Sequence, residues 1–287
     1  MKRAIIIIGL LIAACGALQA QPKQNGRIPT REKRGYDQRS VIDTAHVRVL
    51  YALNAKEIKD ENTYIDLGKL EAGKNVHKYS SEFLNLSDQA AIRWKKEKGH
   101  TDNVPKSLWM GGQKEHQEHW SELVFSDYII RDNHLTEYSA MPLWGERDNG
   151  RYTEEWPLMK WALEDETQTI LGHKCQKATC RFRGRDFVAW FATDVPIKGG
   201  PWKFGGLPGC ILKVYDKDKL YVWEAVAIER GTYPITVYSE RFFPKASREH
   251  IYKLQKRYNE NYWGTIGWTN EDGTTPGKSA FQPLEME

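Results

Sequence analysis

The sequence predicts a mainly β protein of the α+β class, built on one curved antiparallel sheet with flanking helices. Short runs rich in β-branched and aromatic residues recur between residues 46 and 228. Frequent turn signals separate these runs and helical segments are few, which indicates antiparallel pairing. The composition agrees, because 40% of the residues are hydrophobic and the chain holds 11 Trp, 14 Tyr and 9 Phe. Such a composition is typical of a folded core and not of a disordered chain.

Residues 1–20 have the three parts of a secretory signal. A positive start at Lys2 and Arg3 precedes an apolar run from Ala4 to Ala14, and Ala20 offers a small residue before a cut. The run is shorter than the ~20 residues of a membrane-spanning helix, and no later segment approaches that length. We therefore expect a protein exported to the periplasm or the medium, with no transmembrane segment.

A second interpretation of the same region stays open. Ile12-Ala13-Ala14-Cys15 resembles a lipobox, in which Cys15 would be acylated and would anchor a lipoprotein. Residues 16–20 look like the end of an ordinary signal, which favours soluble release. Loss of Lys2 and Arg3 lowers the formal net charge from +4 to +2. Charges of both signs are interspersed, so the sequence shows no basic patch of the kind that binds nucleic acid.

The expected organisation after the signal is a flexible polar lead-in (21–43), a β-rich domain (44–262) and a polar tail (263–287). A helix is expected over 87–98 with Ser87 as its N-cap, and another over 247–262, where apolar residues recur at helical spacing. Residues 101–112 are expected to be a loop. The expected strands are 46–53, 64–70, 76–80, 121–131, 135–140, 161–169, 175–182, 187–192, 210–215 and 220–228.

The most unusual segment is residues 199–212, which hold five glycines and two prolines between two expected strands. Leu207-Pro208-Gly209-Cys210 fits a type II turn, because proline presets the first corner and glycine tolerates a positive φ at the second. A phosphate-binding loop would need a helix and a Lys-Ser/Thr pair after it, and a strand follows here. We therefore expect a corner that sets the shape of the sheet.

Three cysteines lie outside the signal, at positions 175, 180 and 210. In an oxidising compartment at most one bridge can form among them. Cys175 and Cys180 would face opposite sides of one strand, so Cys210 is the expected partner of one of the two, and which one stays open. No ligand spacing for zinc accompanies them, and no metal or other cofactor is expected.

Residues 206–211 read Gly-Leu-Pro-Gly-Cys-Ile, one substitution from the signature of the GLPGLI family of exported Bacteroidetes proteins, which the chain resembles. The resemblance extends to 170–178 and 189–196 and is specific over about 168–215. Cys210 departs from the family, which has leucine there. The residues that carry the resemblance are Gly206, Leu207, Pro208, Gly209, Cys210, Ile211, Cys175, Trp190, Asp194, Pro196, Gly200 and Pro201.

What the resemblance implies is an exported cell-envelope protein of unknown biochemical activity, with no catalytic residues to carry over. Members often occur near outer-membrane receptor systems, so an outer-membrane receptor is an implied partner. The strand pattern also resembles the half-barrel of periplasmic lipoprotein carriers, a curved sheet that holds an apolar ligand. Fold alone does not fix function, but the sequence offers no acid–base–nucleophile set, so we expect a non-enzymatic binding or accessory module for an apolar ligand or an outer-membrane partner.

Candidate chemistry is sparse. His116 and His119 are three residues apart, and on a helix they would share one side, but a third metal ligand is missing. Asp194 precedes Val195-Pro196, where it caps a turn or serves as a general base. The alternative function is therefore a hydrolase that uses Asp194 or the His116/His119 pair. The tryptophans offer stacking surfaces for sugars, although aromatic residues in strands more often fill a core.

Overall fold

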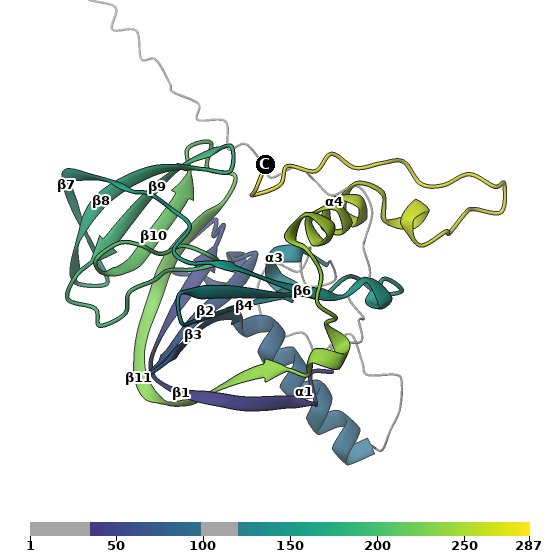
Figure 1. The fold of residues 1–287 in the computed structure, drawn as a ribbon, viewed down its shortest axis with the longest axis horizontal. Coiled ribbons are helices and arrows are strands. Elements are labelled where there is room, and N and C mark those ends of the chain that lie inside the picture. Colours follow the sequence, from purple (N-terminus) through teal and green to yellow (C-terminus); the bar gives the residue numbers. More distant parts are fainter. Residues whose placement is uncertain (1–34, 99–119) are drawn as a thin grey trace, which may run out of the picture.

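The structure is a computed structural model that describes residues 35–98 and 120–287. One antiparallel sheet of eleven strands runs through it in the order β6-β5-β4-β3-β2-β1-β11-β10-β9-β8-β7 (Figure 1). The sheet is open, and β6 and β7 are its two edges. Its strands are β1 (Arg39–Leu53), β2 (Asp66–Gly73), β3 (Val76–Ser81), β4 (Ser126–Arg131), β5 (His134–Ser139), β6 (Gly150–Glu155), β7 (Ala162–Ile170), β8 (His173–Phe182), β9 (Arg185–Ala192), β10 (Cys210–Asp216) and β11 (Val222–Tyr238).

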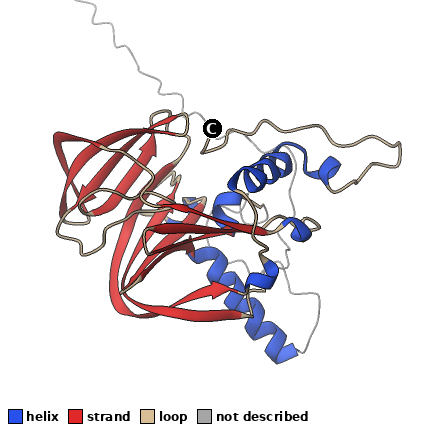
Figure 2. Ribbon diagram, viewed as in Figure 1, coloured by secondary structure: helices blue, strands red, loops and turns tan. Residues whose placement is uncertain are grey.

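Figure 2 shows the mainly β character of the chain, with few helices beside the sheet. The helices are α1 (Glu82–Lys98), α3 (Glu122–Phe125) and α4 (Arg248–Thr265), with short 3₁₀ turns η1 (Glu61–Thr63), η3 (Glu146–Asp148) and η4 (Glu240–Phe242). The predicted fold class, a mainly β chain with one curved antiparallel sheet and flanking helices, is confirmed. Within the described ranges, no helix combines the length and the apolar character that crossing a membrane requires.

The long central pair β1 and β11 bends the sheet. The two strands pair from Arg39 with Tyr238 to Leu53 with Trp223, and their register shifts three times along the way. Each shift is a local irregularity of the kind that increases the twist and kinks a strand. The sheet therefore folds over, so that β4 and β5 face β8, β9 and β10 across a shared hydrophobic cluster (Figure 1).

Helix α1 begins five residues before the predicted start. Ser81 ends β3, and its hydroxyl accepts a hydrogen bond from the backbone N–H of Leu84 at 3.0 Å. This side chain satisfies one of the free donors of the first turn, so Ser81, and not Ser87, caps the helix. In contrast, the second predicted helix is capped as expected, because Ser247 accepts a hydrogen bond from the N–H of His250 at 3.1 Å.

Other boundaries also differ from the predictions. Residues 122–125 form α3 and not a strand, since Ser121 accepts a hydrogen bond from Leu123 N–H and starts a helical turn. Strand β6 was not predicted. Strand β1 begins at Arg39, inside the stretch assigned to the lead-in, and β11 continues ten residues beyond its predicted end. The signal 1–20, Cys15, the expected loop 101–112 and most of the lead-in lie outside the described residues.

The segment 263–287 is more than a polar tail. Helix α4 takes its first three residues, and an exposed stretch then runs away from the helix and returns to the ends of β8 and β9 (Figure 1). There the side chains of Leu284 and Glu285 are buried. Leu284 belongs to the main hydrophobic cluster, so the last residues of the sequence are part of the packed domain.

Candidate functional site

The glycine–proline segment 199–209 forms the second part of the β9–β10 connection and does not contain the predicted type II turn. Positive φ occurs at Gly206 (+91°) and not at Gly209, where that turn would require it. Gly209 is needed for a different reason, because a Cβ there would lie 2.1 Å from the carbonyl oxygen of Ala192. The backbone of this segment therefore approaches the end of β9 more closely than any side chain would allow.

The same segment fills the space inside the folded-over sheet. Trp202, Phe204 and Leu207 are buried in the main hydrophobic cluster. The Phe204 ring lies edge-on to three aromatic rings, with centroids 5.0 Å from Phe187, 5.1 Å from Trp202 and 5.8 Å from Trp223. Side chains of the chain itself thus occupy the interior, where a lipid carrier would hold its ligand.

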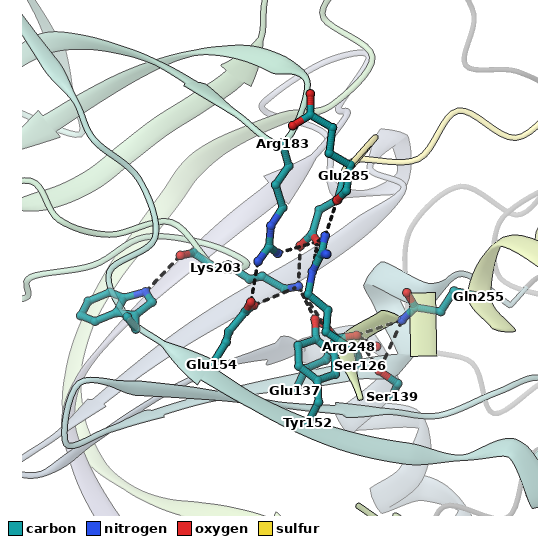
Figure 3. Close-up of polar contacts among 12 residues, drawn as sticks. Ser126, Glu137, Ser139, Tyr152, Glu154, Arg183, Lys203, Arg248, Gln255 and Glu285 are labelled. Atoms are coloured by element: carbon teal, nitrogen blue, oxygen red, sulfur yellow. Dashed lines mark hydrogen bonds and ion pairs between the residues drawn. The ribbon is translucent and has the colours of Figure 1, made fainter. Parts of the chain in front are cut away.

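Lys203, which stands between Trp202 and Phe204 in the sequence, is buried with its ammonium group among carboxylates (Figure 3). Its Nζ lies 2.9 Å from Glu137 on β5, 2.5 Å from Glu285 and 3.8 Å from Glu154 on β6. It also donates a hydrogen bond to the hydroxyl of Tyr152 at 2.6 Å. Lys203 therefore ties the glycine–proline segment to both an edge hairpin and the segment 281–287.

Two arginines complete this buried ion network, which we define as Glu137, Glu154, Glu285, Arg183, Lys203 and Arg248 (Figure 3). Arg183, in the β8–β9 turn, contacts Glu154 at 2.5 Å and Glu285 at 2.6 Å. Arg248, at the start of α4, contacts Glu285 as well. Three cations thus face three carboxylates, and the charges of the network balance.

Glu137 is hydrogen-bonded by neutral side chains in addition to its ion pair with Lys203. It accepts hydrogen bonds from Tyr152 at 2.6 Å, Ser139 at 2.5 Å and Gln255 at 2.9 Å. Burial alone would raise its pKa, but the charge of Lys203 and the hydrogen bonds from Ser139 and Tyr152 outweigh burial, so the pKa is lowered. Glu137 is therefore ionised at neutral pH and does not act there as an acid.

Glu285 and Lys203 are held in their charged forms by each other. Burial opposes the ionisation of Glu285, but Lys203, Arg183 and Arg248 outweigh it and lower the pKa of this carboxyl to about 2. Burial likewise opposes the charge of Lys203, and the surrounding carboxylates outweigh it and raise its pKa. Neither group exchanges a proton near neutral pH, which is the behaviour of a structural or ligand-holding ion cluster and not of an acid–base catalyst.

The structure brings Asp194 together with a histidine, His173. The His173 Nδ1 lies 2.8 Å from Asp194 Oδ2 at the surface, and the two side chains are 30% and 61% exposed. The hydrogen bond from His173 lowers the pKa of Asp194. Neither residue lines any of the three cavities described below. The other candidates, His116 and His119, lie outside the described residues.

The three cysteines are buried free thiols, which corrects the expected disulfide. Cys175 is on β8 and Cys210 on β10, with β9 between them, so their backbones are separated by two strand spacings, roughly 10 Å. A disulfide requires Cα atoms within about 7 Å. Burial raises the pKa of Cys175 to about 11 and that of Cys210 to about 12, so neither supplies a thiolate.

The residues that carry the GLPGLI resemblance are mostly core residues. Among them Asp194, Pro196, Gly206 and Pro208 are exposed, and these four lie at turns of the β9–β10 connection. The remaining eight are buried: Cys175, Trp190, Gly200, Pro201, Leu207, Gly209, Cys210 and Ile211. Most residues of the motif therefore pack in the interior and contribute to the fold.

Three cavities accompany these sites. One of about 30 Å³ lies beside the ion network and is lined by Glu122, Tyr128, Glu137, Lys203 and Glu285, among others. An open groove of about 430 Å³ runs along the ends of the β8–β9 and β10–β11 hairpins and the segment 281–286. A second open groove, of about 390 Å³, lies between α4 and Lys278.

Sequence reasoning missed the ion network. Its members come from β5, β6, the β8–β9 turn, the glycine–proline segment, α4 and the last residues of the sequence, so no local spacing connects them. One signal was available, since Lys203 stands alone between two aromatic residues in an otherwise apolar segment. If the aromatic residues on either side of a lysine are buried, the lysine is buried with them, and its charge then needs carboxylates around it.

The chain is similar to one family model over part of its length and, weakly, to solved structures. A profile described as "N-glycanase peptide, N-terminal domain" matches residues 154–242, under a third of the chain. No protein of curated function matches the sequence. Two solved structures of PNGF-II, in space groups C2 and P21, align with TM-scores of 0.45 and 0.43 at 13% and 15% identity. They cover 75% and 74% of this chain, which spans about a third of their length (33% and 34%).

Proposed function

We propose that this chain is an exported, non-enzymatic accessory module of the bacterial cell envelope that binds a partner protein. The signal-like residues 1–20 and the GLPGLI-like motif support export. Of the two ligand classes expected from the sequence, an apolar molecule or a partner, the filled interior favours the partner. This filled interior is the observation that carries the proposal.

The volumes favour this choice. A site for an apolar ligand has a volume of about 300 Å³ or more and is lined mainly by apolar groups. The cavity beside the core measures about 30 Å³ and is lined by charged and aromatic residues. The two larger spaces are open grooves at the surface, lined by charged residues and by the segment 278–286. Such surfaces suit contact with another macromolecule.

The match of residues 154–242 to the N-terminal domain of an N-glycanase peptide favours a setting near N-glycan processing. In this proposal the chain itself cleaves no glycan. The test is to isolate the protein from the periplasm, measure its mass in the native state, and incubate it with an N-glycopeptide. We expect a chain that starts at Gln21, no co-purified small ligand and no released glycan.

The second candidate function is a hydrolase that uses Asp194. The observation in its favour is the hydrogen-bonded His173–Asp194 pair, which is the base-and-orienter half of a nucleophilic site. Release of glycan or hydrolysis of a peptide by the purified protein, abolished by His173→Ala and by Asp194→Asn, would favour this candidate and contradict the first. A co-purified lipid would instead contradict the choice of a partner protein.

A further inference from the structure

The geometry points to a peptide-binding site at the ends of β8, β9 and β11, which the chain's own residues 281–287 fill. We define these residues as the strap. The ligand class is an extended segment of a partner protein in which an acidic residue follows an apolar one, as Glu285 follows Leu284. This inference rests on the proposed binding role and names the kind of partner.

The strap is held through its main chain, as a bound peptide is. The Tyr221 hydroxyl donates a hydrogen bond to the carbonyl of Gln282 at 2.6 Å. The Arg185 guanidinium donates two to the carbonyl of Pro283, at 2.9 and 2.7 Å. The Met286 N–H donates to the carbonyl of Arg183 at 2.9 Å. Main-chain contacts of this kind supply affinity for an extended segment whatever its side chains.

Two adjacent side chains of the strap supply specificity. Leu284 is 3% exposed and packs into the main hydrophobic cluster. The carboxylate of Glu285 meets Lys203, Arg183 and Arg248, which come from three separate parts of the chain (Figure 3). By contrast, the flanking Met286 and Glu287 are exposed. The site therefore selects for an apolar residue followed by an acid.

The cations that surround Glu285 of the strap require an anionic group between them. Without Glu285, three cations would face only Glu137 and Glu154. Among the described residues, Glu285 is the carboxylate that pairs with Arg248. Since a buried cation without a partner is costly, an empty site would draw in another carboxylate.

The link to the rest of the chain allows exchange. Between α4 and the strap, residues 267–280 are mostly exposed, and they include a small hydrogen-bonded turn at Asn270–Thr274. The open groove of about 430 Å³ runs beside the strap and is lined by Phe281, Pro283 and Met286 together with Arg185 and Asp216. A competing segment has room there to approach before the strap leaves.

The test uses the full chain with a protease site inserted between Asp272 and Gly273, in the exposed turn. After cleavage, a fluorescent peptide with the sequence of residues 279–287 is added and its binding is measured by anisotropy. We expect the labelled peptide to replace the cut fragment, and a peptide with Glu285→Gln to bind at least about tenfold more weakly. The matched control is a peptide with Glu287→Gln, which should bind like the parent because that side chain is exposed.

Uncut protein should bind the same peptide much more weakly, because the tethered strap competes at a high effective concentration. Several results would overturn the inference: unfolding of the protein on cleavage, a fragment that never exchanges, a folded cut protein that does not bind the peptide, or equal binding of the parent and Glu285→Gln peptides. None of these results bears on glycan release or on the mass of the exported chain, which test the proposed function separately.

Discussion

Two groups of charged side chains in this protein behave in opposite ways. The buried ion network holds Lys203 and Glu285, whose side chains are 3% and 8% exposed. The His173–Asp194 pair lies at the surface. By residue type, the surface pair is the one that resembles a catalytic site, because a hydrogen-bonded His–Asp pair is common in such sites. The structure shows that the buried network organises the chain, since it joins segments from both halves of the sheet and the strap.

The difference follows from solvation. Water competes for the exposed pair, so its hydrogen bond contributes little to folding. In the network Lys203, Glu137 and Glu285 are almost fully withdrawn from water, and this loss of hydration is offset only while their partners are present. Removing one member leaves the others buried without compensation. The two sites should therefore respond very differently to substitution, and the following experiments measure by how much.

The largest effect is expected for Lys203→Met. This substitution leaves Glu137 and Glu285 buried without their shared cation, so we expect a loss of about 3–5 kcal/mol in the free energy of unfolding. Urea unfolding followed by circular dichroism measures it. The matched control is Lys177→Met, because Lys177 also contacts two carboxylates, Glu164 and Glu166, but at the surface. Equal losses for both variants would show that burial does not distinguish the sites.

The next effect is on acid stability. The folded-state pKa of Glu285, about 2, lies below the ordinary glutamate value of 4.5, so its contribution to stability is present above pH 4.5 and is lost as the pH falls through about 2. This shift corresponds to roughly 3 kcal/mol. We expect Glu285→Gln to flatten the decline of the melting temperature over this pH range, and Glu287→Gln to leave it unchanged. The same decline in Glu285→Gln as in the parent would contradict the assignment.

A buried carboxyl without a cation sharpens the comparison. Asp66 accepts a hydrogen bond from Ser81 at 2.6 Å, and no ion pair to it occurs among the described residues. Burial raises its pKa from 3.8 to about 7. Stability is therefore lost as the pH rises from about 4 through 7. Asp66→Asn should remove this loss, so that its stability relative to the parent is about 4 kcal/mol higher at pH 8 than at pH 4. If the stability difference between Asp66→Asn and the parent were the same at pH 4 and pH 8, the raised pKa of Asp66 would be refuted.

Much of the fold could be predicted from local patterns, and the network could not. Hairpins such as β8–β9 have alternating residues and a tight turn, so their neighbours in sequence are neighbours in space. The free thiols show the limit, because strand order decides that β9 separates Cys175 from Cys210. Glu285 shows it again. Nothing within the polar stretch 267–287 marks this residue as buried, since its partners lie 37 to 102 positions away.

The smallest effect is expected at the surface pair. Because His173 and Asp194 stay hydrated, His173→Ala and Asp194→Asn should leave the unfolding curve nearly unchanged. Neither variant should change binding of the strap peptide to the cut protein. Loss of a hydrolytic activity in either variant would reverse the comparison, because the exposed pair would then be the functional site.

The central claim is that Lys203 joins the glycine–proline segment to the strap, and a double-mutant cycle with Lys203→Met and Glu285→Gln tests it most directly. Because the two groups are in contact at 2.5 Å within one buried network, their effects on the free energy of unfolding should not add. We predict a coupling energy of at least about 1.5 kcal/mol. Effects that add to within about 0.5 kcal/mol would contradict the account.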